Sequence, residues 1–460
     1  FLGVVYAGRP YAPIDASLPD KRIEKILENL CPGAIVADRE SREHVESIVD
    51  ELAKAEGFDR PQIFIAEDIS RFEQVACADS NCKISESAGD AVTDSENDML
   101  AVVRRQMSMT DPLYIIYTSG STGNPKGVMT SHLSLMTYIN AYCDVMHIEE
   151  SDVLGNQSPL DYIAAIRDIY LPLKTGCSTA IIPKEYFMEP NALFDYMNEK
   201  KVSSVGWSVS AFTILTSLGA FEEVGLKSLR KICFSGSVMP CRVLRKWQEN
   251  LPEAHFVNQY GPTEATASCT YYSVDHTVEE DEVLPIGKAY DNYRVFLIDE
   301  HGNEPAVGEQ GEICVCGPIL ALGYYNDPER TAAAFTLNPL NRAYPERMYR
   351  TGDYGRLDED GILHFCGRMD RQIKHMGHRV ELDEVEHAAN VVEGVAESCV
   401  IYNKAKEVLI LFYTGDCDRR SLALALRDEL PGFMVPRDLV PENFNSVDAI
   451  EKLVKELVEE

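Results

Sequence analysis

Basic residues are scarce in this sequence. Among 460 residues, 43 Lys and Arg stand against 74 Asp and Glu, which gives a formal net charge of -31. A surface with this excess of negative charge repels polyanions, although a local basic pocket for one nucleotide remains compatible with it. The composition therefore argues against an extended nucleic-acid-binding or anionic-membrane-binding surface, and we expect neither partner.

The sequence also lacks cysteine pairs with metal-site spacing and long apolar runs. None of the 13 cysteines belongs to a CxxC pair or a Cys/His cluster with zinc-site spacing, and several lie in apolar strand-like runs. No apolar stretch is long enough to cross a bilayer, and no signal sequence is recognisable. We therefore expect a cytoplasmic protein without a structural metal site, whose cysteines are small buried side chains in a reducing environment.

The first residue is not Met. The sequence begins within an apolar run, FLGVVYAG, and we therefore expect a piece of a longer chain whose N-terminal part is truncated. The length is sufficient for two or three domains with a large buried core.

Strand-like apolar runs alternate with amphipathic helical stretches over most of the chain. Examples of the strands are residues 33–37, 62–66, 113–117 and 178–183, and examples of the helices are residues 21–30 and 192–200. This alternation predicts an α/β fold with a largely parallel sheet.

Short strands and turns predominate from about residue 283, which predicts a β-rich subdomain near the end of a large multi-sheet domain. A charged segment at residues 368–371 follows the last of these hairpins. We place the domain boundary there, with a large N-terminal domain over residues 1–369 and a small mobile C-terminal α/β domain over residues 370–460.

The most informative segment is YIIYTSGSTGNPKG at residues 114–127, an apolar strand that leads into a loop of hydroxyl residues and glycines. Hydroxyl donors, close backbone approach at glycine and one lysine suit a polyphosphate. The loop offers Thr118, Ser119, Gly120, Ser121, Thr122, Gly123 and Lys126. Lys126 lies between Pro125 and Gly127, so the segment is not a Walker loop. A flexible linker is the structural alternative, but a linker does not need the apolar strand before it.

Four later segments share this glycine-rich and charged character: NQYGPTE at 258–264, GEICVCGPILALGYY at 311–325, YRTGD at 349–353 and GRMDRQIKHMGHRVE at 367–381. Together with the loop, they closely resemble the core motifs of the adenylate-forming ligases. This family includes acyl-CoA synthetases, adenylation domains of nonribosomal peptide synthetases and D-alanine carrier-protein ligases. The segments AGRPYAPID, YGPTEAT and GHRVELDEVE resemble the amino-acid-adenylating branch most.

The resemblance implies two half-reactions. A small carboxylic or amino acid attacks the α-phosphate of ATP held with Mg²⁺, which gives an acyl-adenylate and pyrophosphate. A phosphopantetheine thiol, of a carrier protein or of CoA, then takes the acyl group. Chemistry of this kind depends on positioning and on charge neutralisation more than on covalent catalysis.

The resemblance also implies roles for individual residues. The loop residues, with Lys126, would hold the β- and γ-phosphates. Asn258, Tyr260 and Gly261 would bind the adenine side, Asp353 the ribose hydroxyls, and Arg368 the nucleotide. The catalytic candidates are Lys126, Thr263 at the α-phosphate, Glu264 as the Mg²⁺ ligand and Asp370 as the hinge; Gly377, His378 and Arg379 would line the channel for the thiol.

Each of these roles has a structural alternative when it is taken singly. Tyr260 suits a core position, Glu264 a helix cap and Asp353 a β-turn. Arg368 and Asp370 suit a surface ion pair of little consequence. The five motifs in the family's order and spacing favour the functional roles.

The acyl pocket departs from the amino-acid-adenylating pattern. The family's pocket motif has an Asp that binds the substrate's α-amine, and the flanking residues align Ile163 with it. Because Ile163 cannot balance an ammonium, this alignment predicts an aryl, hydroxy, keto or short aliphatic acid. Asp161, two residues earlier, is the alternative amine ligand. The other pocket candidates suit a modest substrate: Trp207, Ser235, Gln259, Ala267 and Ser268, with Cys233 nearby.

The C-terminal segment departs as well. The family follows its MVP segment with an NGK lysine that assists adenylation, and PRDLVPENFNSVDAIEKLVKELVEE lacks that motif. Lys452 and Lys455 are expected on the solvated face of a terminal amphipathic helix. Loss of this charge predicts slow adenylation, and it makes a nucleotide-binding pseudoenzyme within a larger synthetase the alternative function.

Overall fold

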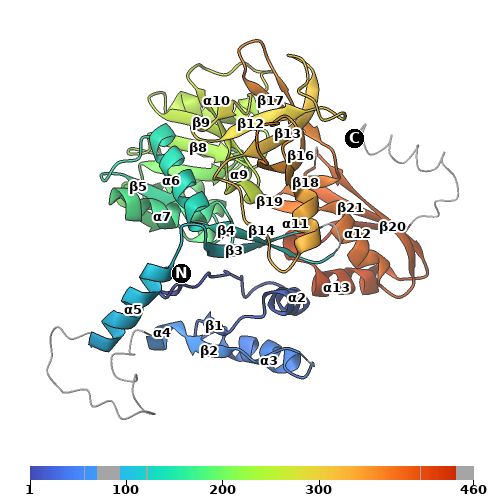
Figure 1. Cartoon of the computed structure of the whole chain (residues 1–460). Coiled ribbons are helices and arrows are strands. Elements are labelled where there is room, and N and C mark those ends of the chain that lie inside the picture. Colours follow the sequence, from blue (N-terminus) through green and yellow to red (C-terminus); the bar gives the residue numbers. More distant parts are fainter. Residues whose placement is uncertain (56, 70–93, 121–122, 405, 442–460) are drawn as a thin grey trace. The chain divides into compact units, whose positions relative to one another are not determined.

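The computed structural model describes residues 1–460 except residue 56 and residues 70–93, 121–122, 405 and 442–460 (Figure 1). The chain divides into two compact units. Unit 1 comprises Phe1–Ser108, Ser119–Gly127 and Asp383–Glu460, and unit 2 comprises Met109–Thr118 and Val128–Leu382. The hinge at Asp370 and the boundary at 369/370 stay predictions.

A seven-stranded sheet with the order β11-β10-β9-β8-β7-β5-β6 forms the centre of unit 2. The strands are β5 (Val153–Asn156), β6 (Ser178–Ile181), β7 (Ser204–Ser208), β8 (Lys231–Ser235), β9 (His255–Tyr260), β10 (Thr270–Val274) and β11 (Lys288–Ala289). The pairs from β6 through β5, β7 and β8 to β9 are parallel, whereas β9–β10 and β10–β11 are antiparallel. The predicted α/β fold with a largely parallel sheet is therefore confirmed.

Helices connect these strands, as parallel pairing requires. They are α6 (His132–Met146), α7 (Ala165–Thr175), α8 (Pro190–Glu199), α9 (Val209–Ser217) and α10 (Cys241–Asn250), with the 3-10 turns η2 (Lys184–Met188) and η3 (Thr263–Ala265). An aromatic core lies between helices and sheet, where Trp207, Phe212 and Trp247 are at most 1% exposed. The edge-to-face ring contacts of Trp247 with Phe212 and Trp207 fix this packing.

The β-rich subdomain predicted after residue 283 is present in unit 2. Its sheet has the order β12-β13-β16-β15, with β17 paired to β16. The strands are β12 (Arg294–Ile298), β13 (Gln310–Cys316), β15 (Phe335–Leu337), β16 (Arg347–Leu357) and β17 (Leu363–Arg368), and α11 (Pro328–Ala334) precedes β15. All of its pairs are antiparallel.

Two smaller sheets complete the β structure of unit 2. One has the order β14-β4-β3, formed by β14 (Gly323–Tyr324), β4 (Lys126–Ser131) and β3 (Pro112–Thr118). The other is the antiparallel hairpin of β18 (Gln372–His375) and β19 (His378–Glu381). Left-handed Met376 and Gly377, with φ of 51° and 84°, make the tight turn between β18 and β19.

Unit 1 contains two groups of elements. The N-terminal group comprises α1 (Leu2–Tyr6), α2 (Asp20–Leu30), β1 (Ala34–Ala37), α3 (Arg42–Leu52), β2 (Gln62–Ile65), α4 (Ala66–Ile69) and α5 (Asp94–Gln106), and β1 and β2 are parallel. The C-terminal group comprises α12 (Leu382–Asn390), β20 (Val395–Asn403), β21 (Val408–Gly415), α13 (Arg419–Glu429), the 3-10 turn η4 (Gly432–Met434) and β22 (Asp438–Pro441), with the sheet order β20-β21-β22.

Ion pairs join these two groups. Glu429 of α13 accepts from Lys21 and Lys25 of α2 at 2.7 and 3.2 Å. Arg22 of α2 contacts Glu384 of α12 at 2.5 Å, and both side chains are almost fully buried. In the described part of the chain, no helix has the length and apolarity needed to span a membrane.

Candidate active site

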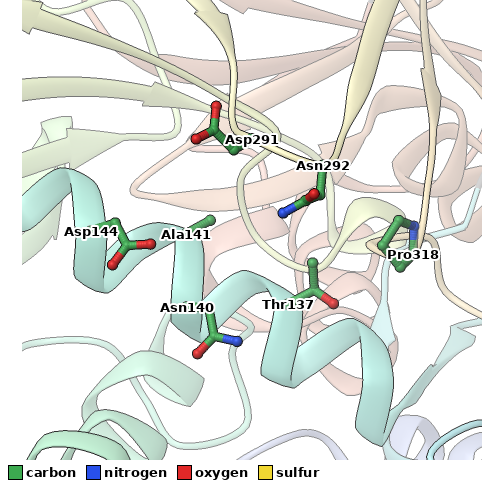
Figure 2. Close-up of a pocket in the computed structure, with 7 residues that line it drawn as sticks. All are labelled: Thr137, Asn140, Ala141, Asp144, Asp291, Asn292 and Pro318. Atoms are coloured by element: carbon green, nitrogen blue, oxygen red, sulfur yellow. The ribbon is translucent and has the colours of Figure 1, made fainter.

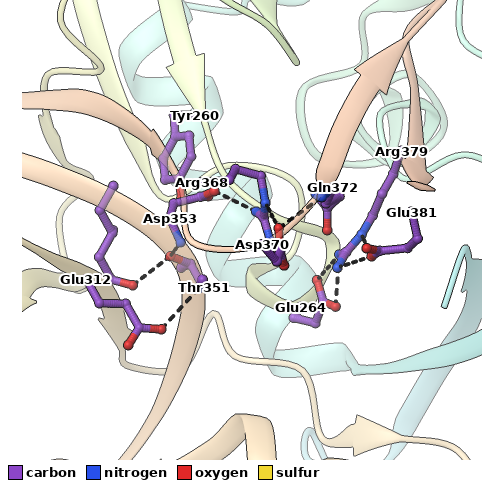
Figure 3. Close-up of polar contacts among 12 residues, drawn as sticks. Tyr260, Glu264, Glu312, Thr351, Asp353, Arg368, Asp370, Gln372, Arg379 and Glu381 are labelled. Atoms are coloured by element: carbon purple, nitrogen blue, oxygen red, sulfur yellow. Dashed lines mark hydrogen bonds and ion pairs between the residues drawn. The ribbon is translucent and has the colours of Figure 1, made fainter. Parts of the chain in front are cut away.

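Asp353 is the centre of a buried polar cluster in unit 2 (Figure 3). β16 presents Asp353 directly opposite Arg368 of β17, and the Arg368 Nη1 donates to Asp353 Oδ1 at 2.5 Å. The hydroxyl of Tyr260, at the end of β9, donates to the other carboxylate oxygen. Burial raises the pKa of the Asp353 carboxyl, and the charge of Arg368 opposes that rise. The β-turn alternative for Asp353 is therefore wrong, because Asp353 is a strand residue in a side-chain cluster.

Glu312 of β13 supports the segment that presents Asp353. One of its oxygens accepts from the Gly352 amide at 3.1 Å, and the other accepts from Arg350. Thr351 donates to the Ile313 carbonyl at 2.7 Å and accepts from the Asp353 amide at 3.0 Å. Gly352 has φ of 71°, which a side chain would strain. The conformation of YRTGD is thereby fixed on both sides.

Arg368 also holds Asp370. Its Nε and Nη2 donate to the two Asp370 oxygens at 2.6 and 2.7 Å, and the Gln372 amide donates to the same carboxylate at 3.1 Å. Burial acts to raise the pKa of Asp370, but the hydrogen bonds and charge of Arg368 outweigh it and hold that pKa below its ordinary value. Arg368 thus bridges Asp353 and Asp370, which is more than the isolated surface pair of the structural alternative.

Glu264 lies in η3 and is fully buried. The Tyr324 hydroxyl donates to its Oε1 at 2.8 Å, and Arg379 Nη1 lies 3.2 and 3.3 Å from its two oxygens (Figure 3). Arg379 also donates to Glu381 at 3.1 Å. Burial acts to lower the pKa of Arg379, but the charge of Glu264 outweighs it and raises that pKa. The Glu264 carboxylate therefore balances the Arg379 guanidinium, and the Glu264 side chain does not cap η3.

The β18–β19 hairpin contacts the predicted acyl segment. The Lys374 ammonium donates to the Tyr162 hydroxyl at 3.1 Å, and the ring of His378 meets the Tyr162 ring edge to face at 5.8 Å. A Cβ on Gly377 would lie 3.3 Å from the Ser208 Oγ. The residues expected to line the thiol channel thus lie beside the start of the predicted acyl pocket.

The predicted adenine residues lie on β9 and in the turn after it. Asn258 donates its amide to the Pro285 carbonyl at 2.8 Å, so this donor has an internal partner. The Tyr260 ring packs against Phe365 at 6.3 Å. Gly261 is required by packing, because a Cβ there would lie 2.5 Å from the Ser268 Cα. Thr263 follows in η3 and is buried.

The phosphate loop from Ser119 to Gly127 belongs to unit 1, and of its predicted residues Ser121 and Thr122 lie outside the described residues. The Gly120 amide donates to Glu384 Oε2 at 3.1 Å. Gly123 has φ of 78°, and a Cβ on it would lie 2.5 Å from the His387 ring. A loop amide that binds a carboxylate has the polarity that a phosphate oxygen needs.

The remaining predicted phosphate residues lie at the two ends of the loop. Thr118 ends β3, and its buried hydroxyl makes no hydrogen bond to the described residues. Ser119 is buried, and Lys126 begins β4.

The predicted acyl-pocket residues occupy the ends of the central parallel strands. Ser235 of β8 is in register with Gln259 of β9, and the Ser268 hydroxyl donates to the Gln259 side chain at 3.2 Å. Ala267, next to Ser268, has a left-handed φ of 76°. Ile163 is 6% exposed. An amine at Ile163 would therefore meet an apolar wall.

Two other pocket candidates are less directly placed. Asp161 is half-buried and has an interaction partner. Trp207 is completely buried and donates its indole N–H to the Gly155 carbonyl at 2.8 Å, so that its polar atom has a partner within the core.

Several residues of these clusters were not singled out from the sequence. Tyr324 and Glu384 each hold a predicted site residue, and Glu312 holds Gly352, the neighbour of the predicted Asp353. A signal existed for Glu312, because it is a charged residue inside the apolar run GEICVCG. For Glu384, which lies 264 positions from Gly120, local sequence carries no such signal.

A surface pocket of about 450 Å³ lies elsewhere in unit 2 (Figure 2). It is lined by Thr137, Asn140, Ala141, Asp144, Asp291, Asn292 and Pro318. None of the predicted site residues lines it.

Comparison with known proteins supports the motif analysis. The family model for AMP-binding enzymes matches residues 1–325. The D-alanine--D-alanyl carrier protein ligase of Bacillus thuringiensis (strain Al Hakam) is 31% identical over 450 residues, in an alignment that covers 95% of this chain and 81% of that protein.

Solved structures share the fold. The Vibrio cholerae adenylation domain AlmE, in complex with glycyl-adenosine-5'-phosphate, matches with a TM-score of 0.79 at 22% identity, over 98% of this chain and 85% of that one. NpsA-ThdA, an artificially fused adenylation-PCP di-domain from Klebsiella oxytoca, matches with a TM-score of 0.74 at 20% identity, over 99% of this chain and 83% of that one. The chain therefore belongs to the family of AMP-binding enzymes, and it is an adenylate-forming ligase.

Proposed function

We propose that this ligase activates a small carboxylic or amino acid as its adenylate and transfers the acyl group to the phosphopantetheine thiol of a carrier protein. The Bacillus thuringiensis relative is named for a D-alanyl carrier protein, and the Vibrio cholerae domain holds a glycyl adenylate. CoA carries the same thiol and is the alternative acceptor.

The buried Asp353 cluster carries the nucleotide part of this proposal. An ionised carboxylate has about four acceptor positions, and Tyr260 and Arg368 occupy one on each oxygen. Each oxygen therefore keeps a position that accepts from a ribose hydroxyl. Tyr260 offers its ring to the adenine, and Arg368 supplies a cation that offsets part of the carboxylate charge facing the α-phosphate.

Magnesium fits this site through Glu264. Mg²⁺ is typically bound by one or two carboxylates together with substrate phosphates, and Glu264 already neutralises a cation, the Arg379 guanidinium. When bound, the ion would neutralise charge on the phosphates of ATP. For Glu264 to bind it, Arg379 has to leave at least one of the two oxygens that it now contacts.

The phosphate loop and the hairpin carry the remaining steps. Loop amides such as that of Gly120, together with Lys126, hold the departing pyrophosphate. The hydrogen bond from the Gly120 amide to the Glu384 carboxylate supports this role, because it shows that the amide accommodates an anionic oxygen. The β18–β19 hairpin borders the path of the thiol, and its contacts with Tyr162 support that role.

A nucleotide-binding pseudoenzyme is the second candidate, and the missing NGK lysine favours it. Pyrophosphate exchange into ATP, stimulated by a panel of carboxylic and amino acids, separates the two candidates. Acid-dependent exchange supports the ligase. If no acid stimulates exchange but ATP binding is measurable, the result contradicts the ligase and supports the pseudoenzyme.

The acceptor is tested separately. Formation of an acyl thioester on a phosphopantetheinylated carrier protein, measured by intact mass, supports the carrier. A thioester formed with CoA alone supports CoA.

A further inference from the structure

Arg167 of α7 is a buried cation close to the predicted acyl pocket. It is 2% exposed, and its Nε makes no hydrogen bond to the described residues. One of its Nη atoms donates to the Gly206 carbonyl, and the nearest carboxylate oxygen, of Asp168, lies 3.8 Å from Nε. Asp168 is itself bound by Asn156 at 2.9 Å. The guanidinium thus keeps hydrogen-bonding capacity that its surroundings do not use.

The surroundings of Arg167 are rich in donors. Three further buried groups that can donate make no hydrogen bond to the described residues: the hydroxyls of Tyr290 and Tyr293, and the Gln259 amide nitrogen. Buried polar groups without a partner are unfavourable, so that such groups are rarely collected without a ligand or water. An acceptor that enters this region would therefore find donors that have no partner among the described residues.

Tyr138, Tyr142 and Cys233 surround the Arg167 guanidinium. Burial raises the pKa of Tyr138 to about 12, and the positive charge of Arg167 opposes that rise. The thiol of Cys233 and the Tyr142 ring also lie within the field of the guanidinium, which is 5.7 Å from the ring centroid. Tyr290 also interacts electrostatically with Tyr138 and Cys233.

Strand geometry connects this region to the predicted acyl pocket. Side chains two residues apart on a strand share a face, so half-buried Ser235 and fully buried Cys233 of β8 point to the same side. In register with Cys233 lies Gly206, whose carbonyl binds Arg167. An acyl group that passes Ser235 therefore proceeds toward Cys233 and the guanidinium.

Gly206 makes room for the guanidinium. A Cβ at this position would lie 2.5 Å from the Arg167 Cζ and Nε, so that no other residue fits without displacing Arg167. Ile163, which aligns with the amine-binding Asp, lies four residues before Arg167 and is buried. The pocket wall thus combines an apolar residue where an ammonium would need a carboxylate with a buried positive charge, and this balance favours an anion.

We propose that Arg167 binds a second carboxylate of the substrate, and that the acid activated by this enzyme is consequently a small dicarboxylic acid or an acidic amino acid. The inference rests on the proposed acid-activating function and specifies its substrate class. The carboxylate that reacts with ATP points toward the nucleotide, and the second one accepts hydrogen bonds from Arg167 and the neighbouring hydroxyls. Sites built to hydrogen-bond a group reject analogues that lack it far more strongly than apolar pockets do.

The test compares each dicarboxylate with the analogue in which an uncharged amide replaces the second carboxylate. The pairs are malonate, succinate and glutarate with their monoamides, and aspartate with asparagine. Pyrophosphate exchange measures activation, and the acid-dependent rise in melting temperature in the presence of ATP measures binding without catalysis. We expect at least one dicarboxylate to exceed its amide analogue by about 100-fold in kcat/KM.

Variants assign this preference to Arg167. Arg167→Met abolishes it with the KM for ATP unchanged, and Arg167→Lys, which keeps the charge, retains part of it. Since Arg167→Met leaves Asp168 buried beside an apolar side chain, the double variant with Asp168→Asn keeps the test valid if the single variant does not fold. Gly206→Ala weakens the preference by displacing the guanidinium. Arg242→Met, at an exposed position of α10, is the control without effect.

The outcomes separate this inference from the function on which it rests. Preferred activation of acids that lack a second carboxylate overturns the inference and leaves the ligase intact. A preference for dicarboxylates that survives Arg167→Met does the same. Stabilisation by a dicarboxylate that depends on Arg167, without any exchange, supports the inference and contradicts the ligase. No stabilisation and no exchange with any acid overturns both.

Discussion

The buried carboxylate of Glu264 is balanced by the guanidinium of Arg379, with Nη1 at 3.2 and 3.3 Å from its two oxygens. The two residues come from motifs 115 positions apart in sequence. In the proposed reaction Glu264 serves a metal ion, so Arg379 and the metal compete for one carboxylate. This relationship connects the stability of unit 2 to its chemistry.

Removing Arg379 should destabilise unit 2. Arg379→Met leaves the Glu264 carboxylate buried without its cation, and breaking a buried pair in this way costs about 3 to 5 kcal/mol. Chemical denaturation measures the loss. The double variant with Glu264→Gln should regain most of it, whereas a double variant as unstable as the single one would contradict the ion-pair account.

Asp353→Asn should weaken nucleotide binding. The change removes one charged acceptor shared by Tyr260 and Arg368, and a hydrogen bond to a charged group contributes about 1.5 to 3 kcal/mol. We expect the KM for ATP to rise at least tenfold in exchange assays. Asp358→Asn, an acidic residue whose partner is His364, is the control. Equal ATP affinities of the wild type and Asp353→Asn would refute the ribose assignment.

Lys126→Ala should impair handling of the phosphates. The loop loses its one positive charge, so the KM values for ATP and pyrophosphate should both rise, while the KM for the acid stays within about threefold. A change confined to the acid would exclude Lys126 from the phosphate site.

Glu384→Gln should destabilise unit 1 more than Glu429→Gln does. Glu384 is buried and serves both Arg22 and the Gly120 amide, whereas Glu429 forms partly exposed pairs with Lys21 and Lys25. Losing the buried charge should cost about 3 kcal/mol, and losing the exposed pairs about 1 kcal/mol or less. Denaturation curves of the two variants that coincide would show that the buried pair contributes no more than a surface pair.

Asp168 should make stability depend on pH. Burial raises its pKa from 3.8 to about 6 despite the opposing charge of Arg167, so between these values the folded chain binds more protons than the unfolded chain. The free energy of unfolding should therefore fall as pH rises from about 4 to about 6, by about 2 kcal/mol from this group. In Asp168→Asn that contribution is absent. An identical pH slope in the variant and the wild type would exclude the effect.

The parts of the fold that sequence predicts well are those with strong local patterns. Apolar runs such as residues 113–117 become strands buried on both faces, as in β3, and the turn residues after 283 predict the antiparallel subdomain. Motif residues such as Asp353 and Arg368 are predictable through the resemblance of their motifs to a known family, and the structure places the two opposite each other in one hairpin.

The contacts between distant segments are not predictable in this way. Arg167 looks like an exposed charge in RDIYLPLKTG, and only the packing of α7 under Gly206 buries it. The Glu384–Gly120 contact likewise depends on tertiary packing that no periodicity encodes. Sequence therefore suggests the chemistry of the nucleotide side, and the three-dimensional structure is needed to show that Arg167 is buried near the predicted acyl pocket.

The most direct test of the central claim is detection of the acyl-adenylate. The protein is incubated with Mg·ATP, pyrophosphatase and each acid in turn, and the nucleotides are identified by mass. Our account predicts an acyl-AMP with at least one small acid, in an amount comparable to that of the enzyme. Recovery of unreacted ATP with every acid, from protein that binds ATP, would contradict it.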